Sequence, residues 1–252
     1  MPAAVEELHL VGGNAALDFA NTVGSHSSDH PHDYIHTFEE LLDWCARAGV
    51  LTPEQGRVLR KKAAAEPARA AEALKQAGRL RQTIYRLFMA VARGEPTLRA
   101  ELDRFNSFVE GAFGHARVAY TGGAFGLDFD PAGRLDGMLA AIAWSAIELL
   151  RSSEIGRVKA CGKDTCGWLF VDRSKNKSRR WCEMSDCGNG EKARRFQSRK
   201  KGHAGAQEQR SGRRRARRRP VEARGLAAEA HKAAVEDAGA AAEDRGVAVE
   251  ED

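Results

Sequence analysis

The chain has 252 residues, of which 42% are hydrophobic, so it is long enough and apolar enough to bury a core. It contains 40 Lys and Arg against 35 Asp and Glu. Its long apolar segment, residues 135–150, is too short to span a bilayer, so we expect no membrane partner. The first seven residues have neither the basic nor the apolar region of a secretory signal, so we expect a cytoplasmic protein.

Charge divides the chain into three segments. Residues 1–156 contain 16 Lys and Arg against 20 Asp and Glu, residues 157–225 contain 22 against 7, and residues 226–252 contain 2 against 8. We expect a mostly helical globular domain over residues 1–156 and a zinc module over residues 157–201. Residues 202–252 form a basic, then acidic, low-complexity tail that we expect to be disordered, because it cannot bury a core.

Gly12 and Gly13 precede a predicted short helix that carries Asp18 and Asn21. Asp18 and Asn21 are three residues apart, so a helix places them on one side, where they are our candidate ligand-binding residues. Helix capping and buried hydrogen bonds explain the same pattern, and both interpretations stay open.

A polar loop rich in histidine follows. Four histidines within eleven residues could form a second metal site, although a solvated loop is the commoner explanation of such a cluster. They are His26, His30, His32 and His36.

Helix signals recur along the rest of the first segment. Thr37 and Glu40 have the form of a capping box, and Pro53 suits the first turn of a second helix. Apolar residues at helical spacing predict a third helix that ends at Gly94 and a fourth that begins at Pro96, with the apolar stripes in the core.

Two alternating segments, residues 116–121 and 125–130, flank a glycine pair and predict a β-hairpin. A long apolar helix from Leu135 to Leu150 then leads directly to the cysteines. The predicted fold class is therefore α+β. It comprises a mainly helical N-terminal domain with a β-hairpin, a small zinc-finger module with four cysteine ligands, and a disordered tail.

Four of the five cysteines form two evenly spaced pairs, Cys161-x4-Cys166 and Cys182-x4-Cys187, with 15 residues between them. This spacing is typical of a closed tetrahedral site for one structural Zn²⁺. Disulfides are the alternative, but they need an oxidising compartment. Four thiolates leave no position for an activated water, so we expect no catalytic residues here and no enzyme. Cys45 lies on a predicted helix and is expected to be a buried apolar residue.

The interval between the cysteine pairs contains a predicted strand, residues 167–171, and a polar connection, residues 172–178. Three aromatic residues are placed to form an apolar cluster beside the metal, which matters because so short a module has little core of its own. They are Trp168, Phe170 and Trp181.

The segment from Cys161 to Asn189 resembles the CGNR zinc finger of bacterial proteins. It contains Cys-Gly-Trp-Leu-Phe-Val-Asp-Arg-Ser-Lys-Asn from Cys166, Arg-Arg-Trp-Cys before the second pair, and Cys-Gly-Asn from Cys187. Residues 12–23, Gly-Gly-Asn-Ala-Ala-Leu-Asp-Phe-Ala-Asn-Thr-Val, resemble the opening of the ABATE domain, which usually precedes that finger. The family is described as stress-induced transcription regulators, so the resemblance implies DNA binding. The family's signature arginine after Cys-Gly-Asn is Gly190 here.

Basic residues around and after the last cysteine pair can bind a polyanion by displacing its condensed counterions. We predict a bacterial transcription regulator whose N-terminal domain senses a small molecule, a stress signal or a partner, and whose zinc module binds DNA. An RNA-binding protein and a finger that binds another protein are the alternatives. The candidate nucleic-acid contacts are Arg179, Arg180, Lys192, Arg194, Arg195 and Arg199.

Overall fold

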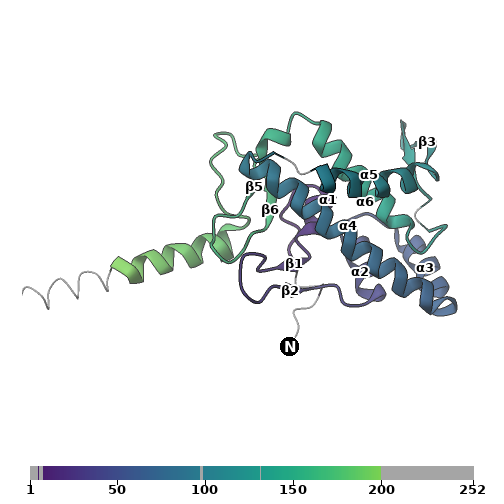
Figure 1. The fold of residues 1–252 in the computed structure, drawn as a ribbon, viewed down its shortest axis with the longest axis horizontal. Helices are drawn as coiled ribbons and strands as arrows, with labels where there is room; N and C mark the ends of the chain where they lie inside the picture. Colours follow the sequence, from purple (N-terminus) through teal and green to yellow (C-terminus); the bar gives the residue numbers. More distant parts are fainter. Residues whose placement is uncertain (1–4, 6–7, 97–98, 131, 200–252) are drawn as a thin grey trace, which may run out of the picture. The chain divides into compact units, whose positions relative to one another are not determined.

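The computed structural model describes residues 5, 8–96, 99–130 and 132–199 (Figure 1). The predicted arginine-rich and acidic tail, residues 202–252, lies outside the described residues. Those described up to Glu191 belong to one compact unit, and those from Lys192 onward belong to a second.

The predicted α+β class is confirmed, because helices make up most of the N-terminal part and strands occur only in pairs among the described residues. The labelled helices are α1 (Ala15–Ala20), α2 (Phe38–Arg47), α3 (Pro53–Ala65), α4 (Pro67–Arg93), α5 (Arg99–Phe113) and α6 (Gly137–Arg151), with the short helical turns η2 (Ile155–Arg157) and η3 (Met184–Gly188). A further helix covers residues 189–199. The antiparallel strand pairs are β1 (Val23–Gly24) with β2 (His32–Asp33), β3 (Arg117–Thr121) with β4 (Ala124–Asp128), and β5 (Val158–Ala160) with β6 (Leu169–Val171). None of the described helices combines the length and the apolar character needed to cross a membrane.

Local sequence signals fix several helix ends. Thr37 accepts a hydrogen bond from the Glu40 N–H and the Glu40 carboxylate accepts one from the Thr37 N–H, so the predicted capping box of α2 is confirmed. Thr52 and Gln55 form a second capping box at α3. Gly94 ends α4 in the left-handed conformation, with φ of 66°, which glycine adopts without a steric penalty.

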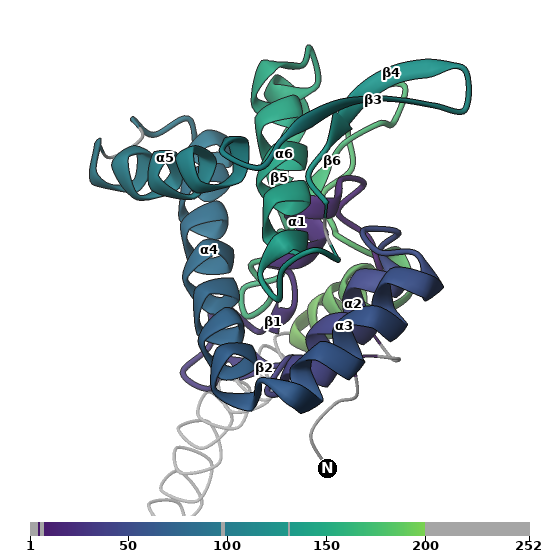
Figure 2. The same ribbon diagram turned by 90° about the vertical axis from the view of Figure 1, so that its right-hand side faces the viewer.

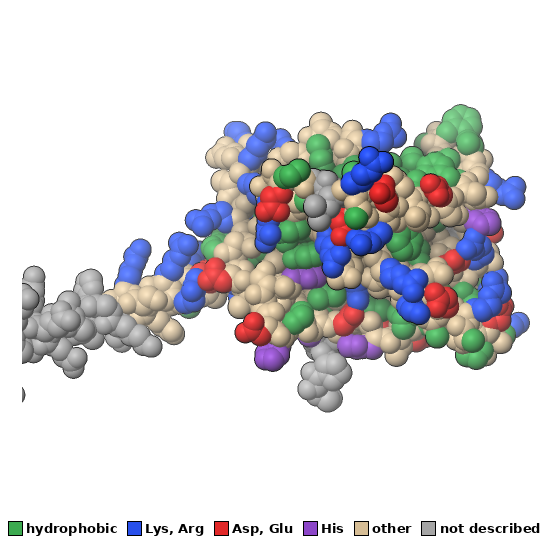
Figure 3. All heavy atoms as spheres, in the orientation of Figure 1, with side chains coloured by type: hydrophobic (Ala, Val, Ile, Leu, Met, Phe, Trp, Pro, Cys, Tyr) green, Lys and Arg blue, Asp and Glu red, His purple; other side chains and the backbone are tan. Residues whose placement is uncertain are grey.

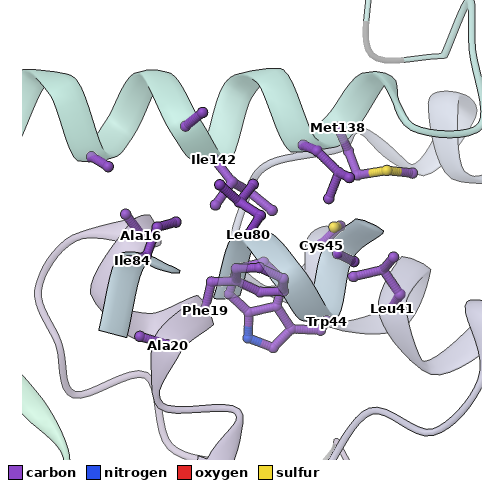
Figure 4. Packing of buried hydrophobic residues seen from close by; sticks show 14 of the residues in the cluster. Ala16, Phe19, Ala20, Leu41, Trp44, Cys45, Leu80, Ile84, Met138 and Ile142 are labelled. Carbon is purple, nitrogen blue, oxygen red and sulfur yellow. The ribbon is translucent and has the colours of Figure 1, made fainter. Parts of the chain in front are cut away.

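The main core lies where α1, α2, α4 and α6 meet (Figure 4). Phe19 of α1 packs on Trp44 of α2, with ring centroids 5.0 Å apart. Cys45 is fully buried in this cluster, as predicted for an apolar thiol, and burial raises its pKa far above the usual value. The core therefore holds α1, which carries Asp18 and leads to Asn21, in a fixed position.

The predicted hairpin is confirmed as β3 and β4, which extend away from the helices (Figure 2). Its side chains Val118, Tyr120 and Phe125 are 74%, 65% and 79% exposed. The predicted core stripe of the fourth helix is only partly correct. Phe105 of α5 is buried, whereas Leu102 is 39% exposed.

Candidate metal centre

The four paired cysteines converge on one point. Their sulfur atoms all lie within 4.8 Å of one another, and no other group of three or more possible metal ligands occurs among the described residues. Sulfur distances of 3.7 Å between Cys166 and Cys182 and 3.5 Å between Cys182 and Cys187 are too long for disulfides. A tetrahedral zinc with Zn–S bonds of about 2.3 Å places its sulfurs roughly 3.8 Å apart. The four thiols therefore fit one Zn²⁺.

Strand pairing and tight turns place the thiols. Cys161 follows β5, and its N–H donates to the Trp168 carbonyl at 2.8 Å, which closes the first cysteine turn. Gly167 has φ of 72°, and a Cβ there would lie 2.9 Å from the Cβ of His26 and 3.0 Å from the Tyr85 hydroxyl. Glycine is required at this position both by the backbone conformation and by the close packing.

The predicted aromatic cluster is confirmed. Phe170 is fully buried against Cys161, Cys182 and Cys187, and Trp168 and Trp181 pack around them partly buried. This apolar shell supplies the small core that the segment needs.

The charge of the four thiols favours a cation between them. Hydrogen bonds with Cys166 and Cys182 lower the pKa of Cys161, whereas burial raises the pKa of Cys187. Four thiolates this close repel one another unless a divalent cation compensates, and a coordinating thiol is deprotonated outright. The residues match the charge and donor softness of zinc. Zinc would hold the two cysteine turns together, and its closed coordination sphere would leave no open position.

Asp172 is the polar centre of the finger. It is completely buried and accepts hydrogen bonds from the Lys159 amine at 2.6 Å and the Ser174 hydroxyl at 2.6 Å. The Arg179 N–H donates to it at 3.0 Å. Burial opposes ionisation, but these hydrogen bonds outweigh it and hold the pKa of Asp172 well below its usual value. Asp172 thereby ties the connection between the cysteine pairs to β5.

The turn before α1 is held against the finger. Asp18 accepts a hydrogen bond from the Gly12 N–H at 2.7 Å, and the Gly12 carbonyl accepts one from the Val171 N–H of β6 at 2.9 Å. A Cβ on Gly12 would lie 2.9 Å from the Asp18 nitrogen, so the turn has no space for a side chain. Burial raises the pKa of Asp18 to about 6, although hydrogen bonds from Gly12 and Val11 act in the opposite direction.

Asn21 pairs with the finger like a strand residue. Its side-chain oxygen accepts from the Leu169 N–H at 2.8 Å, and its side-chain nitrogen donates to the Leu169 carbonyl at 2.8 Å. Both polar atoms of the amide are therefore paired within the protein, and Asn21 is 1% exposed. Of the two interpretations left open by the sequence, the structure favours buried hydrogen bonding over ligand binding for Asp18 and Asn21.

Further hydrogen bonds join the first cysteine turn to the N-terminal part. The Trp168 indole N–H donates to the Val23 carbonyl at 2.8 Å, and the His26 N–H donates to the Cys166 carbonyl at 3.0 Å. The Tyr85 hydroxyl donates to the Gly167 carbonyl at 3.3 Å. We refer to these contacts, with those of Gly12 and Asn21, as the joint.

The histidine loop contributes to the joint. His26 stacks on Tyr85 with ring centroids 3.7 Å apart, and His32 packs on Tyr34 at 4.5 Å. Burial lowers the pKa of His26. No second metal cluster forms among the described residues, so the alternative metal site at these histidines has no support.

The candidate nucleic-acid residues fall into two groups. Arg179 faces inward: its guanidinium lies 4.3 Å from the Phe170 ring centroid and donates to the carbonyls of Trp181, Val11 and Cys182. Arg180 lies over the Trp181 ring at 5.5 Å and does not share these inward contacts. The others lie on a helix over residues 189–199 and are all exposed: Lys192, Arg194, Arg195 and Arg199.

The basic side chains of this helix lie on two different faces. Lys192, Arg195 and Arg199 are spaced by three and four residues and share one face, whereas Arg194 is about 100° around the axis from Arg195. Figure 3 shows Lys and Arg side chains along the described part of this helix. No acidic side chain in the described part of the chain forms an ion pair with the three residues of that face, and Arg194 has an interaction within the chain.

Gly190 stands at the start of this helix in open surroundings. A Cβ added there meets no atom within 4 Å. The position therefore has space for the family's arginine, and the departure from the family pattern changes charge and helix propensity without relieving any crowding.

Several residues of the centre were missed by sequence reasoning. Asp172 was assigned to a polar connection, and Tyr85 was given no role. A single acidic residue among cations directly after a strand was the signal for Asp172. No local signal marks Tyr85, because its partner Gly167 is 82 residues away.

Comparisons with protein families agree with this geometry. The ABATE family, described as a putative stress-induced transcription regulator, matches residues 13–153. The CGNR zinc finger matches residues 157–200. Curated proteins show no match to the sequence. The chain therefore belongs to the ABATE family and carries a CGNR zinc finger directly after the ABATE domain.

Proposed function

We propose that this protein is a cytoplasmic, non-enzymatic transcription regulator that binds duplex DNA through the helix following the zinc site. The observation that carries the proposal is the single face formed by Lys192, Arg195 and Arg199. Exposed cations at these spacings can reach successive phosphates along a groove, while the zinc site directly before the helix in sequence fixes where it begins.

Charge in the finger supports the same role. Residues 157–199 contain 12 Lys and Arg against 5 Asp and Glu, and Asp172 and Glu191 among these acids are buried. Arg180 adds a further cation, whereas the inward contacts of Arg179 lead us to leave it out of the interface. A basic surface of this kind binds a polyanion with an affinity that falls as salt rises.

The first test is a selection of the zinc-loaded, full-length protein against a random duplex-DNA library at about 150 mM salt, where nonspecific binding is weak. We expect an enriched sequence motif. If a protein with one bound zinc enriches no motif, sequence-specific DNA binding is wrong. The same preparation is then tested on single-stranded RNA, which separates an RNA-binding protein from a finger that binds protein.

The second test compares two neighbouring arginines. Replacing Arg195 by Ala should weaken binding to the selected DNA and lower the slope of log affinity against log salt by about one unit, because one phosphate contact is lost. Arg194→Ala is the matched control and should leave the slope unchanged. Equal effects of the two substitutions would show that the helix does not bind by the proposed face, provided that both variants keep the wild-type melting temperature.

A further inference from the structure

The ABATE domain contains a cavity that the zinc site and its helix do not use. A cavity of about 350 Å³ lies between α4, α5 and α6. Phe108, Phe129 and Leu139 contribute an apolar wall, and Phe129 and Leu139 are each only 5% exposed. The polar side of the lining comprises Gln76, Arg79, Ser107, His115, Arg134 and Asp136. Its volume and mixed lining are typical of small-molecule sites.

A second cavity of about 480 Å³ shares Arg79, Ser107 and Phe108 with the first. Its lining adds Arg86 and Arg104 on either side of Glu101. Four arginines and two carboxylates, those of Glu101 and Asp136, thus line the two cavities. The lining is therefore net positive. Residues 1–156 as a whole are net negative, with 16 Lys and Arg against 20 Asp and Glu. The sign of the lining favours an anion.

Of the four arginines that line the cavities, Arg79 has the weakest ion pair. Arg134 donates two hydrogen bonds to Asp136, at 2.9 and 2.6 Å. Arg86 and Arg104 both donate to one oxygen of Glu101, at 2.9 and 2.7 Å. The contact of Arg79 with Glu72 is 4.0 Å long, and the Arg79 side chain is 59% exposed. A guanidinium so weakly paired can bind a carboxylate with two parallel hydrogen bonds.

We propose that the cavity between α4, α5 and α6 binds an amphipathic organic carboxylate. The apolar ring or chain of the ligand lies against Phe108, Phe129 and Leu139, and its carboxylate pairs with Arg79 at the junction of the two cavities. The inference rests on the proposed function, because it gives a chemical class to the signal sensed there. Binding is measured without DNA, so a failure of this proposal and a failure of DNA binding are separate results.

The experiment is isothermal titration calorimetry on the full-length, zinc-loaded protein. Indole-3-acetate is the probe, and indole-3-acetamide is its neutral counterpart of nearly the same shape. Benzoate and octanoate test a smaller ring and a flexible chain. We expect saturable one-to-one binding of at least one carboxylate, and roughly tenfold weaker binding of the amide, because it cannot form the charge-assisted pair. Equal affinity for the acetate and the amide, or no binding of any of the three carboxylates, overturns the proposal.

Two variants locate the site. Arg79→Gln should weaken binding of the best carboxylate roughly tenfold. Lys75→Gln is the matched control, because Lys75 lies on the same helix and 3.9 Å from the same Glu72 but lines neither cavity. Gly111 lines the first cavity and has open space around an added Cβ, so Gly111→Leu should block the ligand without removing a charge. Equal affinities of the Arg79 and Lys75 variants, or full binding by Gly111→Leu, would overturn the assignment of this cavity.

Discussion

Asp18 holds a carboxyl group where ionisation is unfavourable. The side chain is 7% exposed, and burial opposes ionisation of its carboxyl group. Hydrogen bonds from two backbone N–H groups stabilise the carboxylate, but burial has the larger effect. The pKa of Asp18 is therefore about 6 in the folded chain, against 3.8 for an ordinary aspartate. The folded state therefore binds this proton more tightly than the unfolded state does. The stabilisation it gives is fully present below about pH 4 and is lost as the pH rises through about 6.

Replacing Asp18 by Asn should remove this pH dependence while keeping an acceptor for the Gly12 N–H. As the pH rises from about 4.5 to 6, the free energy of unfolding of the wild type should fall relative to Asp18→Asn by up to about 1.4 kcal/mol per pH unit, and the difference should level off above about pH 7. Urea unfolding of both proteins at matched pH values measures it. Other groups, including the zinc thiolates, titrate in both proteins, so their contributions cancel in the difference between the two free energies of unfolding. A difference that stays constant with pH would contradict the raised pKa.

Asn21 shows what the sequence can and cannot reveal at this scale. Spacing alone predicts correctly that Asn21 and Asp18 are close together near one end of α1. It does not predict that the amide pairs with Leu169, 148 residues away, because that contact depends on the packing of the finger. A polar residue with an unseen backbone partner has the same local pattern as a ligand-binding residue. For this reason spacing alone does not separate a buried hydrogen bond from a ligand site in α1, and no local pattern predicts the cavity beside Arg79, whose lining comes from α4, α5 and α6.

At the scale of elements, the finger is stabilised by polar contacts as well as by its cysteines. Asp172 joins β5, through Lys159, to the connection that contains Ser174 and Arg179. Removing the carboxylate charge leaves the Lys159 amine with only backbone carbonyls as partners among the described residues, those of Lys177 and Arg179. Breaking a buried ion pair from one side is strongly destabilising.

We predict that Asp172→Asn lowers the free energy of unfolding by about 2 kcal/mol and lets a competing chelator remove zinc at a lower concentration. Glu154→Gln is the matched control, because the ion pair of Glu154 with Arg173 also joins the finger to the preceding segment but is exposed. Its loss should change stability much less than the loss of the Asp172 carboxylate, because solvent screens an exposed ion pair. Denaturant unfolding and chelator titration measure both variants. Equal effects would mean that burial of Asp172 contributes nothing beyond an ordinary surface pair.

The elements that were predicted well are those with local signals. The capping box of α2, the proline in the first turn of α3, the glycine at the end of α4 and the glycine pair between β3 and β4 each specify a backbone conformation from a few neighbouring residues. Strands β1 and β2 have two residues each, and they carry no alternation that a sequence could reveal. The cysteine spacing determined the metal site for the same reason as the caps, because four ligands in one short segment leave few arrangements.

At the scale of the whole molecule, the finger and the ABATE helices share one compact unit up to Glu191. The joint supplies hydrogen bonds from Asn21, Trp168 and Tyr85, and β6 is bonded to β5 and to the turn at Gly12. Zinc binding in small fingers contributes about 10–16 kcal/mol to folding. Because the joint couples the two parts, we expect loss of zinc to destabilise the helices as well.

Removal of zinc by a strong chelator should lower the melting temperature of the whole helical signal, measured by far-ultraviolet circular dichroism, in a single transition. Addition of zinc to the stripped protein should restore it, and Cys161→Ser should reproduce the stripped state without a chelator. The zinc complex of the chelator, added at the same concentration, controls for nonspecific effects, because it cannot take up further zinc. An unchanged helical transition in zinc-free protein would show that the joint does not couple the finger to the ABATE domain.

The pairing of Asn21 with Leu169 also bears on how such proteins can be rebuilt. A CGNR finger transplanted onto another scaffold would leave behind the amide that pairs with its strand, the carbonyl that accepts the Trp168 indole N–H and the tyrosine that contacts its first cysteine turn. The edge of β6 would then be open to pairing with other chains. A functional chimera should therefore include the finger, the segment from Gly12 to His26, and a tyrosine at the position of Tyr85 in α4. These three parts are not contiguous in sequence.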